Sequence, residues 1–216
     1  MVDKIAFCGP AGSGKDYLAN ILVAELGFHK MALAAPMKEM VAIALDTDVE
    51  TVDKLKSTTP AVRKVLQMIG TEVFRQNFDE MFWINRLLTR VDRMEKSGET
   101  EGIVVTDCRF KNELRSLAKR GFLTVYVDSP EQFKRIKEPR NAFLRLIGRI
   151  STRWAYRTSR HPYYHPSEAE PRELARQGAF HERVWNDRTN DAHDLLYDVM
   201  EAGYRRQLLT SKMRKA

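Results

Sequence analysis

The chain has 216 residues, of which 43% are hydrophobic and 30% are charged, as in ordinary globular proteins and unlike disordered ones. Its apolar runs, such as Met40–Leu45, are far shorter than the roughly 20 residues that a membrane span requires. Asp3 and Lys4 interrupt the start of the chain, which argues against a signal peptide. The two cysteines, Cys8 and Cys108, lack metal-ligand spacing, so we expect a reduced, cytoplasmic protein.

The positive charge is concentrated in one segment. The net charge of the chain is +7, yet Lys134–Arg160 alone carries +8, because nine lysines and arginines stand there against the single acid Glu138. The rest of the chain therefore sums to −1. Such a local excess indicates one anion-binding element rather than a generally basic coat for nucleic acid.

The first half of the chain predicts a buried strand followed by helices. Lys4–Cys8 is a short apolar run typical of a buried strand, and a glycine-rich segment follows it. Leu18, Ile21 and Leu22 then fall on one helical face, and Pro36 suits the first turn of a second helix. We expect two further helices, at about Pro60–Phe74 and Phe82–Glu95.

The second half alternates strands with helices. We expect strands at Ile103–Asp107, Phe122–Val127 and Val184–Trp185, a helix at Asn112–Arg120, a loop at His161–Pro171, and a closing helix with Leu195, Leu196, Val199 and Met200 on one face. Strands that alternate with helices imply a parallel sheet covered on both sides. The sequence therefore predicts an α/β fold in one domain, residues 1–216, with about five parallel strands and helices on both faces.

Residues 9–16, GPAGSGKD, fit the phosphate-loop spacing G-x-x-x-x-G-K. Glycines at these positions let successive backbone N–H groups curl around phosphate oxygens, and the following helix presents its positive end to them. The flanking strand and helix favour this interpretation over a glycine-rich turn that matches by chance. The residues expected to bind ATP are Gly9, Ala11, Gly12, Ser13, Gly14, Lys15 and Asp16, with Lys15 reaching the terminal phosphates.

Two carboxylates are candidates for binding a metal ion. Asp16 stands where phosphate loops usually have Ser or Thr, and a carboxylate is also a hard ligand for Mg²⁺. Its alternatives are to accept a proton from an attacking group or simply to favour a helix start. Asp107 ends an apolar run, the position of the second acidic element of phosphate-loop proteins, with a strand-end turn as its alternative. Cys108 follows where many water-using ATPases have glutamate, which favours transfer to a bound acceptor.

The basic segment predicts a helical lid at about residues 134–165. Its arginines recur every three or four residues and so share one helical face; they are Arg145, Arg149, Arg153, Arg157 and Arg160. Like charges at this spacing oppose the helix unless an anion faces them. A lid closing over transferring phosphates would supply that anion, so Arg149 and Arg153 are candidate catalytic residues beside Lys15 and Asp16. The alternatives are a solvated basic face and a nucleic-acid patch.

Further motifs follow one another in a set order. They are AAPMKEM at 34–40, LQMIGTEVFR at 66–75, FWIN at 82–85, VVTDCRFKNE at 104–113, HPSE at 165–168 and WND at 185–187. Together with GPAGSGKD, they make the sequence resemble the bacteriophage deoxynucleoside monophosphate kinases, a branch of the nucleoside monophosphate kinase-like phosphate-loop proteins. Tyr17 departs from the threonine expected after GKD in that family.

The resemblance implies a P-loop kinase fold with a helical acceptor-binding region at about residues 35–95. The residues that it assigns to the acceptor are Lys38, Arg75, Trp83, Asn85, Asp107, Arg109, His165, Ser167 and Glu168. Asp107 and Arg109 would stand between the two phosphates, and Trp83 could stack on a base. From the residues alone, the alternatives are surface cations for Lys38 and Arg75, a core side chain for Trp83, and a turn-rich loop for HPSE.

The sequence thus predicts an enzyme that uses ATP and Mg²⁺ to phosphorylate a nucleoside monophosphate, with a deoxynucleotide as the expected acceptor. One rival is a P-loop kinase of another small phosphorylated acceptor, such as phosphomevalonate or dephospho-coenzyme A. The other is a nucleic-acid-binding P-loop ATPase. The expected partners are nucleotide substrates, without a membrane or nucleic acid, and a homodimer stays open.

Overall fold

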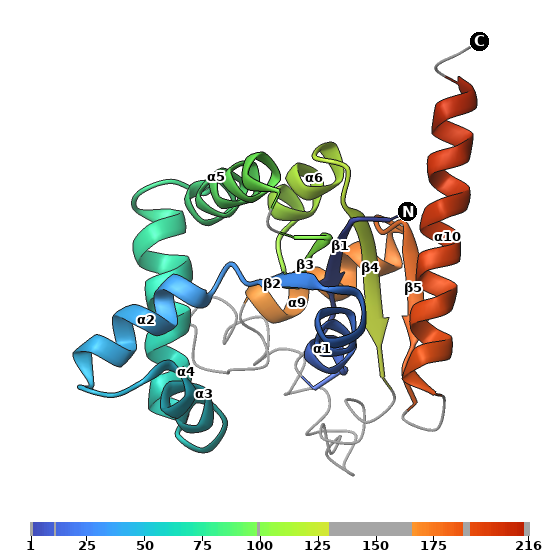
Figure 1. The fold of residues 1–216 in the computed structure, drawn as a ribbon. Coiled ribbons are helices and arrows are strands. Elements are labelled where there is room, and N and C mark those ends of the chain that lie inside the picture. The colour runs from blue at the N-terminus through green and yellow to red at the C-terminus, as the bar shows by residue number, and fades with distance from the viewer. Residues whose placement is uncertain (1, 11, 99, 130–165, 188–190, 214–216) are drawn as a thin grey trace, which may run out of the picture. The chain divides into compact units, whose positions relative to one another are not determined.

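A computed structural model describes residues 2–10, 12–98, 100–129, 166–187 and 191–213 (Figure 1). The chain divides into two compact units, which are described separately. Unit 1 contains Met1–Lys30 and Glu101–Ala216, and unit 2 contains Met31–Thr100. Unit 2 spans the helical region predicted at about residues 35–95, and the assignment of both units to a single kinase domain stays a prediction.

The sheet has five strands in the order β2-β3-β1-β4-β5. They are β1 (Lys4–Cys8), β2 (Phe28–Met31), β3 (Gly102–Cys108), β4 (Leu123–Asp128) and β5 (Glu182–Trp185). Strand β1 pairs in parallel with β3 on one side and with β4 on the other, and β5 pairs in parallel with β4. The connections after β1 therefore lead to opposite sides of it, and open α/β sheets bind ligands at the carboxyl end of such a strand.

Alternate residues of the strands face two different layers of helices. Ile5 and Phe7 of β1 share a buried core with residues of α1 (Lys15–Leu26) and α10 (Ala192–Met213). Successive side chains of a strand point to opposite faces. Helices α6 (Lys111–Lys119) and α9 (Pro166–Arg176) pack together on the other face of the sheet (Figure 1). The predicted α/β fold, with a five-stranded parallel sheet between two helical layers, is confirmed.

Unit 2 is built from helices. They are α2 (Ala35–Ala44), α3 (Val49–Thr58), α4 (Pro60–Gln67), the π-helix η1 (Met68–Gln76) and α5 (Phe82–Ser97). Val41, Ala42 and Val52 form its buried cluster, against which side chains of α4 and η1 pack. Helix η1 approaches α2 closely at Gly70, where an added Cβ would collide with the Met37 side chain.

Four parts of the fold differ from the sequence prediction. Strand β2 and helix α3 were not expected, because β2 has only four residues and α3 has one fully buried apolar side chain, Val52. The helix predicted at Pro60–Phe74 changes at Met68 into the wider π form. The loop predicted at His161–Pro171 is wrong from Pro166 onward, because α9 begins there. Pro166 suits the first position of α9, because a residue in the first turn of a helix needs no partner for its backbone N–H. Pro171 lies further inside the same helix, and its side chain is buried.

No helix among the described residues is long and apolar enough to cross a membrane. The lid predicted at about residues 134–165 lies outside the described residues.

Candidate active site

The predicted phosphate loop follows the central strand β1 and enters helix α1. Its glycines have backbone conformations that other residues rarely adopt, with φ of 144° at Gly9, 81° at Gly12 and 93° at Gly14. Gly9 passes so close to the carbonyl oxygen of Val127 in β4 that a Cβ would collide with it. The chain thus turns tightly between two neighbouring strands and brings the N-terminus of α1, with its outward N–H groups, to the carboxyl end of the sheet.

Lys15 folds back over this loop. Its Nζ donates hydrogen bonds to the carbonyl oxygen of Pro10 at 2.6 Å and to Ser13 Oγ at 3.3 Å. The side chain is 8% exposed, so the ammonium is held beside the backbone groups that would surround a phosphate. An ammonium at this position could reach oxygens bound in the loop, and its contact with the terminal phosphates stays a prediction.

Asn186 braces the loop from the end of β5, a role that the loop pattern does not indicate. Its Nδ2 donates to the carbonyl oxygen of Ser13 at 3.0 Å, and its backbone N–H donates to the carbonyl oxygen of Asp128 at 2.8 Å. The side chain is buried and lies where a Cβ on Gly14 would collide with it. The WND motif at 185–187 was the only signal for this residue in the sequence, and it did not reveal the contact with the loop.

Asp16 lies on the first turn of α1 and forms an ion pair with Lys30, with 2.8 Å between Oδ1 and Nζ. Desolvation alone would raise the pKa of the Asp16 carboxyl. The hydrogen bond and charge of Lys30 outweigh it, with help from Lys15 and Thr106, and hold the pKa below its ordinary value. Asp16 is therefore ionised at neutral pH and touches Thr106, the residue that precedes Asp107 in β3.

The end of β3 presents Asp107 and then turns into α6. Glu113 is buried and its Oε2 accepts hydrogen bonds from the backbone N–H groups of Arg109, at 2.9 Å, and Phe110, at 3.0 Å. This capping arrangement fixes the turn that carries Asp107 and Arg109. Both residues are half-buried at the same end of the sheet as the phosphate loop. Their placement between the two phosphates stays a prediction.

The two cysteines lie opposite each other on β1 and β3, immediately before Gly9 and after Asp107. Both are free and buried. A hydrogen bond that the Cys108 thiol donates to Cys8, burial and the nearby charges of Cys8, Glu113 and Asp107 raise the pKa of the Cys108 thiol well above its ordinary value. Cys108 is therefore a neutral core thiol in this structure and cannot polarise an attacking water as a glutamate would.

The donor set fits a magnesium ion that is shared with a nucleotide. Mg²⁺ usually keeps several waters and binds one or two carboxylates together with substrate phosphates. Asp16 lies in the first turn of α1, and Asp107 lies near the carboxyl end of β3, the strand that pairs with β1. Both are carboxylates of the kind that Mg²⁺ binds, and their role as its ligands stays a prediction. The described residues contain no group of three or more His, Cys, Asp or Glu side chains that could hold a metal ion without a nucleotide.

In unit 2, three of the predicted acceptor residues lie on three different helices. Lys38 on α2 pairs with Asp53 on α3, with 2.8 Å between Nζ and Oδ2. Arg75 is half-buried in the last turn of η1, as its helix-end prediction requires. Asn85 is exposed on the first turn of α5.

Trp83 is a core residue of unit 2. It is 3% exposed, its Nε1–H donates to the carbonyl oxygen of Gly70 at 2.9 Å, and its ring packs against Phe74 and Phe82 with centroid distances of 4.8 Å. A base could stack on the indole only if these rings moved. The structure therefore favours the alternative of a core side chain for Trp83.

The other predicted site residues have no described side chain. Ala11, Arg149, Arg153 and His165 lie outside the described residues. Ser167 and Glu168 lie in the first turn of α9, in a helix rather than in the predicted loop.

Comparison with known protein families finds a match to part of the chain. A family model for deoxynucleotide monophosphate kinases matches residues 49–138, which is less than half of the chain. The matched range contains Arg75, Asn85, Asp107 and Arg109, and it does not reach the phosphate loop.

Individual proteins resemble the chain over different lengths. A protein of Acanthamoeba polyphaga mimivirus, named as a proposed deoxynucleotide monophosphate kinase, is 28% identical over 145 residues, covering 58% of this chain and 74% of the viral protein. The Holliday junction branch migration complex subunit RuvB of Campylobacter jejuni is 39% identical over 72 residues, 30% of this chain and 22% of RuvB. A shikimate kinase structure from Aquifex aeolicus superposes with a TM-score of 0.46 at 14% identity, covering 95% of this chain and 98% of that one. The family model and the viral relative support a phosphotransferase of the kinase kind.

Proposed function

We propose that the protein transfers the γ-phosphoryl group of ATP to a nucleoside monophosphate, with a deoxynucleotide as the acceptor. The observation that carries this proposal is the loop at 9–16, where Lys15 is held over the turn between β1 and α1. The match of the deoxynucleotide monophosphate kinase family to residues 49–138 supports the acceptor class. A bacteriophage source stays a prediction from the sequence.

On the ATP side, the backbone N–H groups of Gly12, Ser13 and Gly14 would bind phosphate oxygens, and Lys15 would stabilise charge on the moving phosphoryl group. Its hydrogen bond to Pro10 would be exchanged for phosphate contacts when ATP enters. Asp16 and Asp107 would hold Mg²⁺, which when bound neutralises charge on the ATP phosphates. Because Lys30 pairs with Asp16, metal binding would have to loosen that ion pair.

On the acceptor side, Lys38, Arg75 and Asn85 of unit 2 would bind the monophosphate. Arg75 presents a planar guanidinium suited to two phosphate oxygens, and Lys38 offers a point charge already drawn to the carboxylate of Asp53. Asp107 and Arg109 would act between the two phosphates. Arg149 and Arg153 would add charge from the lid, and His165, Ser167 and Glu168 would complete the acceptor site.

The test is a product assay. The protein is incubated with ATP, Mg²⁺ and each nucleoside monophosphate in turn, with ribose and deoxyribose forms side by side, and diphosphate formation is followed by chromatography. We expect diphosphate with at least one deoxynucleotide and none without Mg²⁺. If the protein phosphorylates phosphomevalonate or dephospho-coenzyme A and no nucleotide, the proposed kinase activity would stand and the proposed nucleotide acceptor would be wrong.

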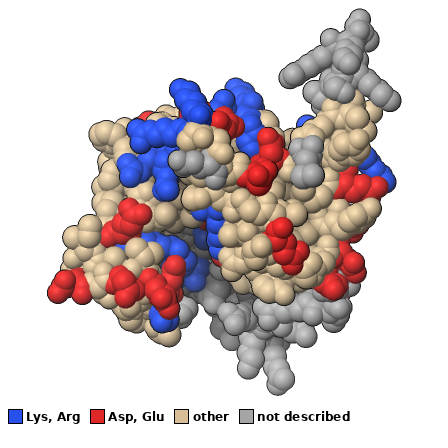
Figure 2. All heavy atoms as spheres, viewed as in Figure 1, with Lys and Arg blue, Asp and Glu red and all other residues tan. Residues whose placement is uncertain are grey.

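A second candidate function is a P-loop ATPase that acts on nucleic acid. The RuvB match and the +8 segment at Lys134–Arg160 favour it. Basic side chains also gather over α5, where Arg86, Arg90 and Arg93 share one exposed stripe (Figure 2). DNA-stimulated ATP hydrolysis without diphosphate product, together with DNA affinity that falls steeply with salt, would favour this candidate over the kinase.

A further inference from the structure

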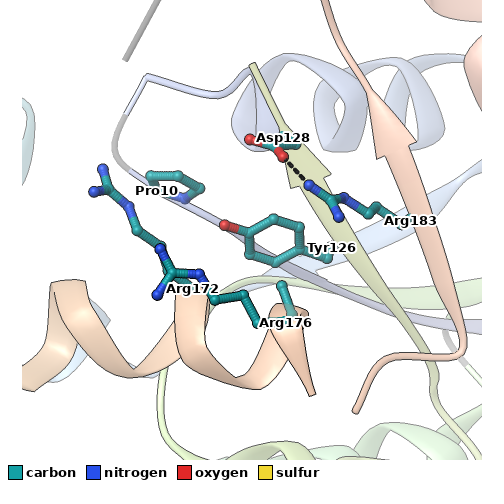
Figure 3. A pocket seen from close by; sticks show the side chains of 7 residues that line it. Pro10, Tyr126, Asp128, Arg172, Arg176 and Arg183 are labelled. Carbon is teal, nitrogen blue, oxygen red and sulfur yellow. Dashed lines mark hydrogen bonds and ion pairs between the residues drawn. The ribbon is translucent and has the colours of Figure 1, made fainter. Parts of the chain in front are cut away.

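A small cavity of about 80 Å³ opens in unit 1 beside the phosphate loop, at the carboxyl end of β4. Its lining residues are Pro10, Tyr126, Asp128, Arg172, Ala175, Arg176 and Arg183. Figure 3 shows the arginines of α9 on one side of the Tyr126 ring and Arg183 of β5 on the other. The volume is several times the roughly 10–15 Å³ that one water requires, so a small polyatomic anion fits.

The cavity has more positive than negative charge. Three arginines line it against one carboxylate, that of Asp128, which pairs with Arg183. Arg176 has only a long contact of 3.7 Å with Glu173, and both of these side chains are exposed. The structure gives Arg172 no ion pair with a described side chain, although it is half-buried. A half-buried guanidinium that no described carboxylate neutralises gains most from an anionic ligand.

Tyr126 and Asp128 hold the wall of the cavity in place. The guanidinium of Arg183 lies 5.8 Å from the centre of the Tyr126 ring and also bonds Asp128, so its direction is fixed by two contacts. Burial and the charge of Asp128 raise the pKa of Tyr126 to about 12, so the phenol keeps its proton. A neutral phenol adds no negative charge to the cavity.

We propose that this cavity is a phosphate-binding subsite in which Arg172, with Arg176, binds the oxygens of a phosphate group at the edge of the phosphate loop. The inference rests on the proposed function, because it adds a second set of cations to the same nucleotide site. Pro10 links the two: it lines the cavity, and its carbonyl oxygen accepts the hydrogen bond from Lys15. The phosphate comes from a bound nucleotide or from inorganic phosphate, and guanidinium pairs suit both.

Binding measurements with inorganic phosphate and with ATP test the subsite at constant ionic strength. The variants are Arg172→Gln and the double variant Arg172→Gln/Arg176→Gln. Arg205→Gln on the exposed face of α10 is the control for the single variant, since it removes one positive charge away from the cavity, and Arg205→Gln/Arg115→Gln, which removes two, is the control for the double variant. We expect phosphate affinity to fall about tenfold or more in the double variant and to be unchanged in its control, as for loss of charged hydrogen bonds.

Two further arms identify the source of the phosphate. If phosphate competes with ATP and the double variant also weakens ATP binding, the group belongs to the nucleotide. If phosphate binds without affecting ATP, the subsite takes the free ion. Unchanged phosphate affinity in both variants, or a loss seen only in Lys15→Met, would overturn the subsite, because the phosphate loop alone would then bind the ion.

Failure of the proposed function is separable from failure of this inference. A protein that forms no nucleoside diphosphate but loses phosphate affinity in the double variant would keep the subsite and lose the kinase reaction. If the protein is an active kinase and both arginine variants bind phosphate and ATP normally, the kinase reaction would stand and the subsite would be rejected.

Discussion

The proposed ATP site at the phosphate loop of unit 1 and the proposed acceptor residues of unit 2 differ in the contacts that their side chains make. In the loop, Lys15 and Asn186 hold the turn itself, so the contacts seen in the structure are those that would shape a phosphate site. In unit 2, Lys38 is bound to Asp53 and Trp83 to Gly70, so the contacts maintain the unit.

The difference follows from what each site is made of. A phosphate loop binds largely through backbone N–H groups, and the backbone conformation is fixed by glycines and a strand-to-helix turn before any ligand arrives. An acceptor site binds through side chains, which form ion pairs and hydrogen bonds with each other when no ligand is present. Substitutions in the two units should therefore have different signatures, in turnover for the loop and in stability for the helices.

Replacing Lys15 should give the largest effect. Lys15→Met removes the cation over the loop and should lower turnover by about two to three orders of magnitude, as loss of one preorganised charge donor does. Urea unfolding should show a folded protein, because the hydrogen bonds lost are to one carbonyl and one hydroxyl.

The matched control is Lys64→Met, which removes an exposed lysine of α4. Phosphoryl transfer by folded Lys15→Met at the wild-type rate would remove the phosphate-loop assignment.

The next largest effect should come from Gly14. Gly14→Ala forces a left-handed backbone on alanine and displaces the Asn186 side chain, so the free energy of unfolding should fall by about 2–4 kcal/mol, with loss of ATP binding. Gly98→Ala is the comparison, because Gly98 also has positive φ but nothing lies within 4 Å of its added Cβ. It should cost about 1–2 kcal/mol and leave ATP binding intact. Equal losses in the two variants would mean that Asn186 does not brace the loop.

Local sequence patterns predicted some features of the fold and of the candidate site, and contacts between distant residues were missed. The strand before the loop, the glycines and the helix after it are local patterns, so the sheet, the loop and its position were predictable. The contacts of Asn186 with Ser13 join residues 173 positions apart, and no spacing rule connects them. The cavity arginines were missed for a related reason. Arg172 and Arg176 follow the segment predicted as a loop at His161–Pro171, and no element was predicted for them, although they share one helix.

In unit 2, substitution of Trp83 should change stability rather than acceptor binding. Trp83→Phe keeps a ring but leaves the buried carbonyl of Gly70 without its indole donor, so unfolding should become easier by about 1–3 kcal/mol. The KM for the nucleoside monophosphate should stay within a factor of two or so, because a core ring does not touch the base. A rise in KM without any loss of stability would instead favour the prediction that Trp83 contacts the base of the acceptor.

A smaller effect is expected at the ion pair of α2 with α3. Asp53→Asn releases Lys38, and the pair is exposed enough that stability should change by less than about 1 kcal/mol. If Lys38 binds the monophosphate, its release should lower KM, whereas Lys38→Met should raise it. Glu50→Gln frees Lys54 from an equally short pair on the exposed side of α3 and is the control. Identical KM values in all three variants would leave Lys38 as a surface cation.

The smallest effect should be the pH-dependent one at Asp16. Because Lys30 holds the pKa of Asp16 below its ordinary value of 3.8, the pair stabilises the fold above about that pH and loses this effect as the pH falls through the lowered pKa. Lys30→Met should therefore lower the free energy of unfolding at pH 7 by less than about 1 kcal/mol, as for other exposed pairs. Urea unfolding of both proteins at acid pH should show the difference closing. A difference that persists in acid would assign the effect to the hydrogen bond of Lys30 with Asn20, 3.1 Å long, which does not titrate.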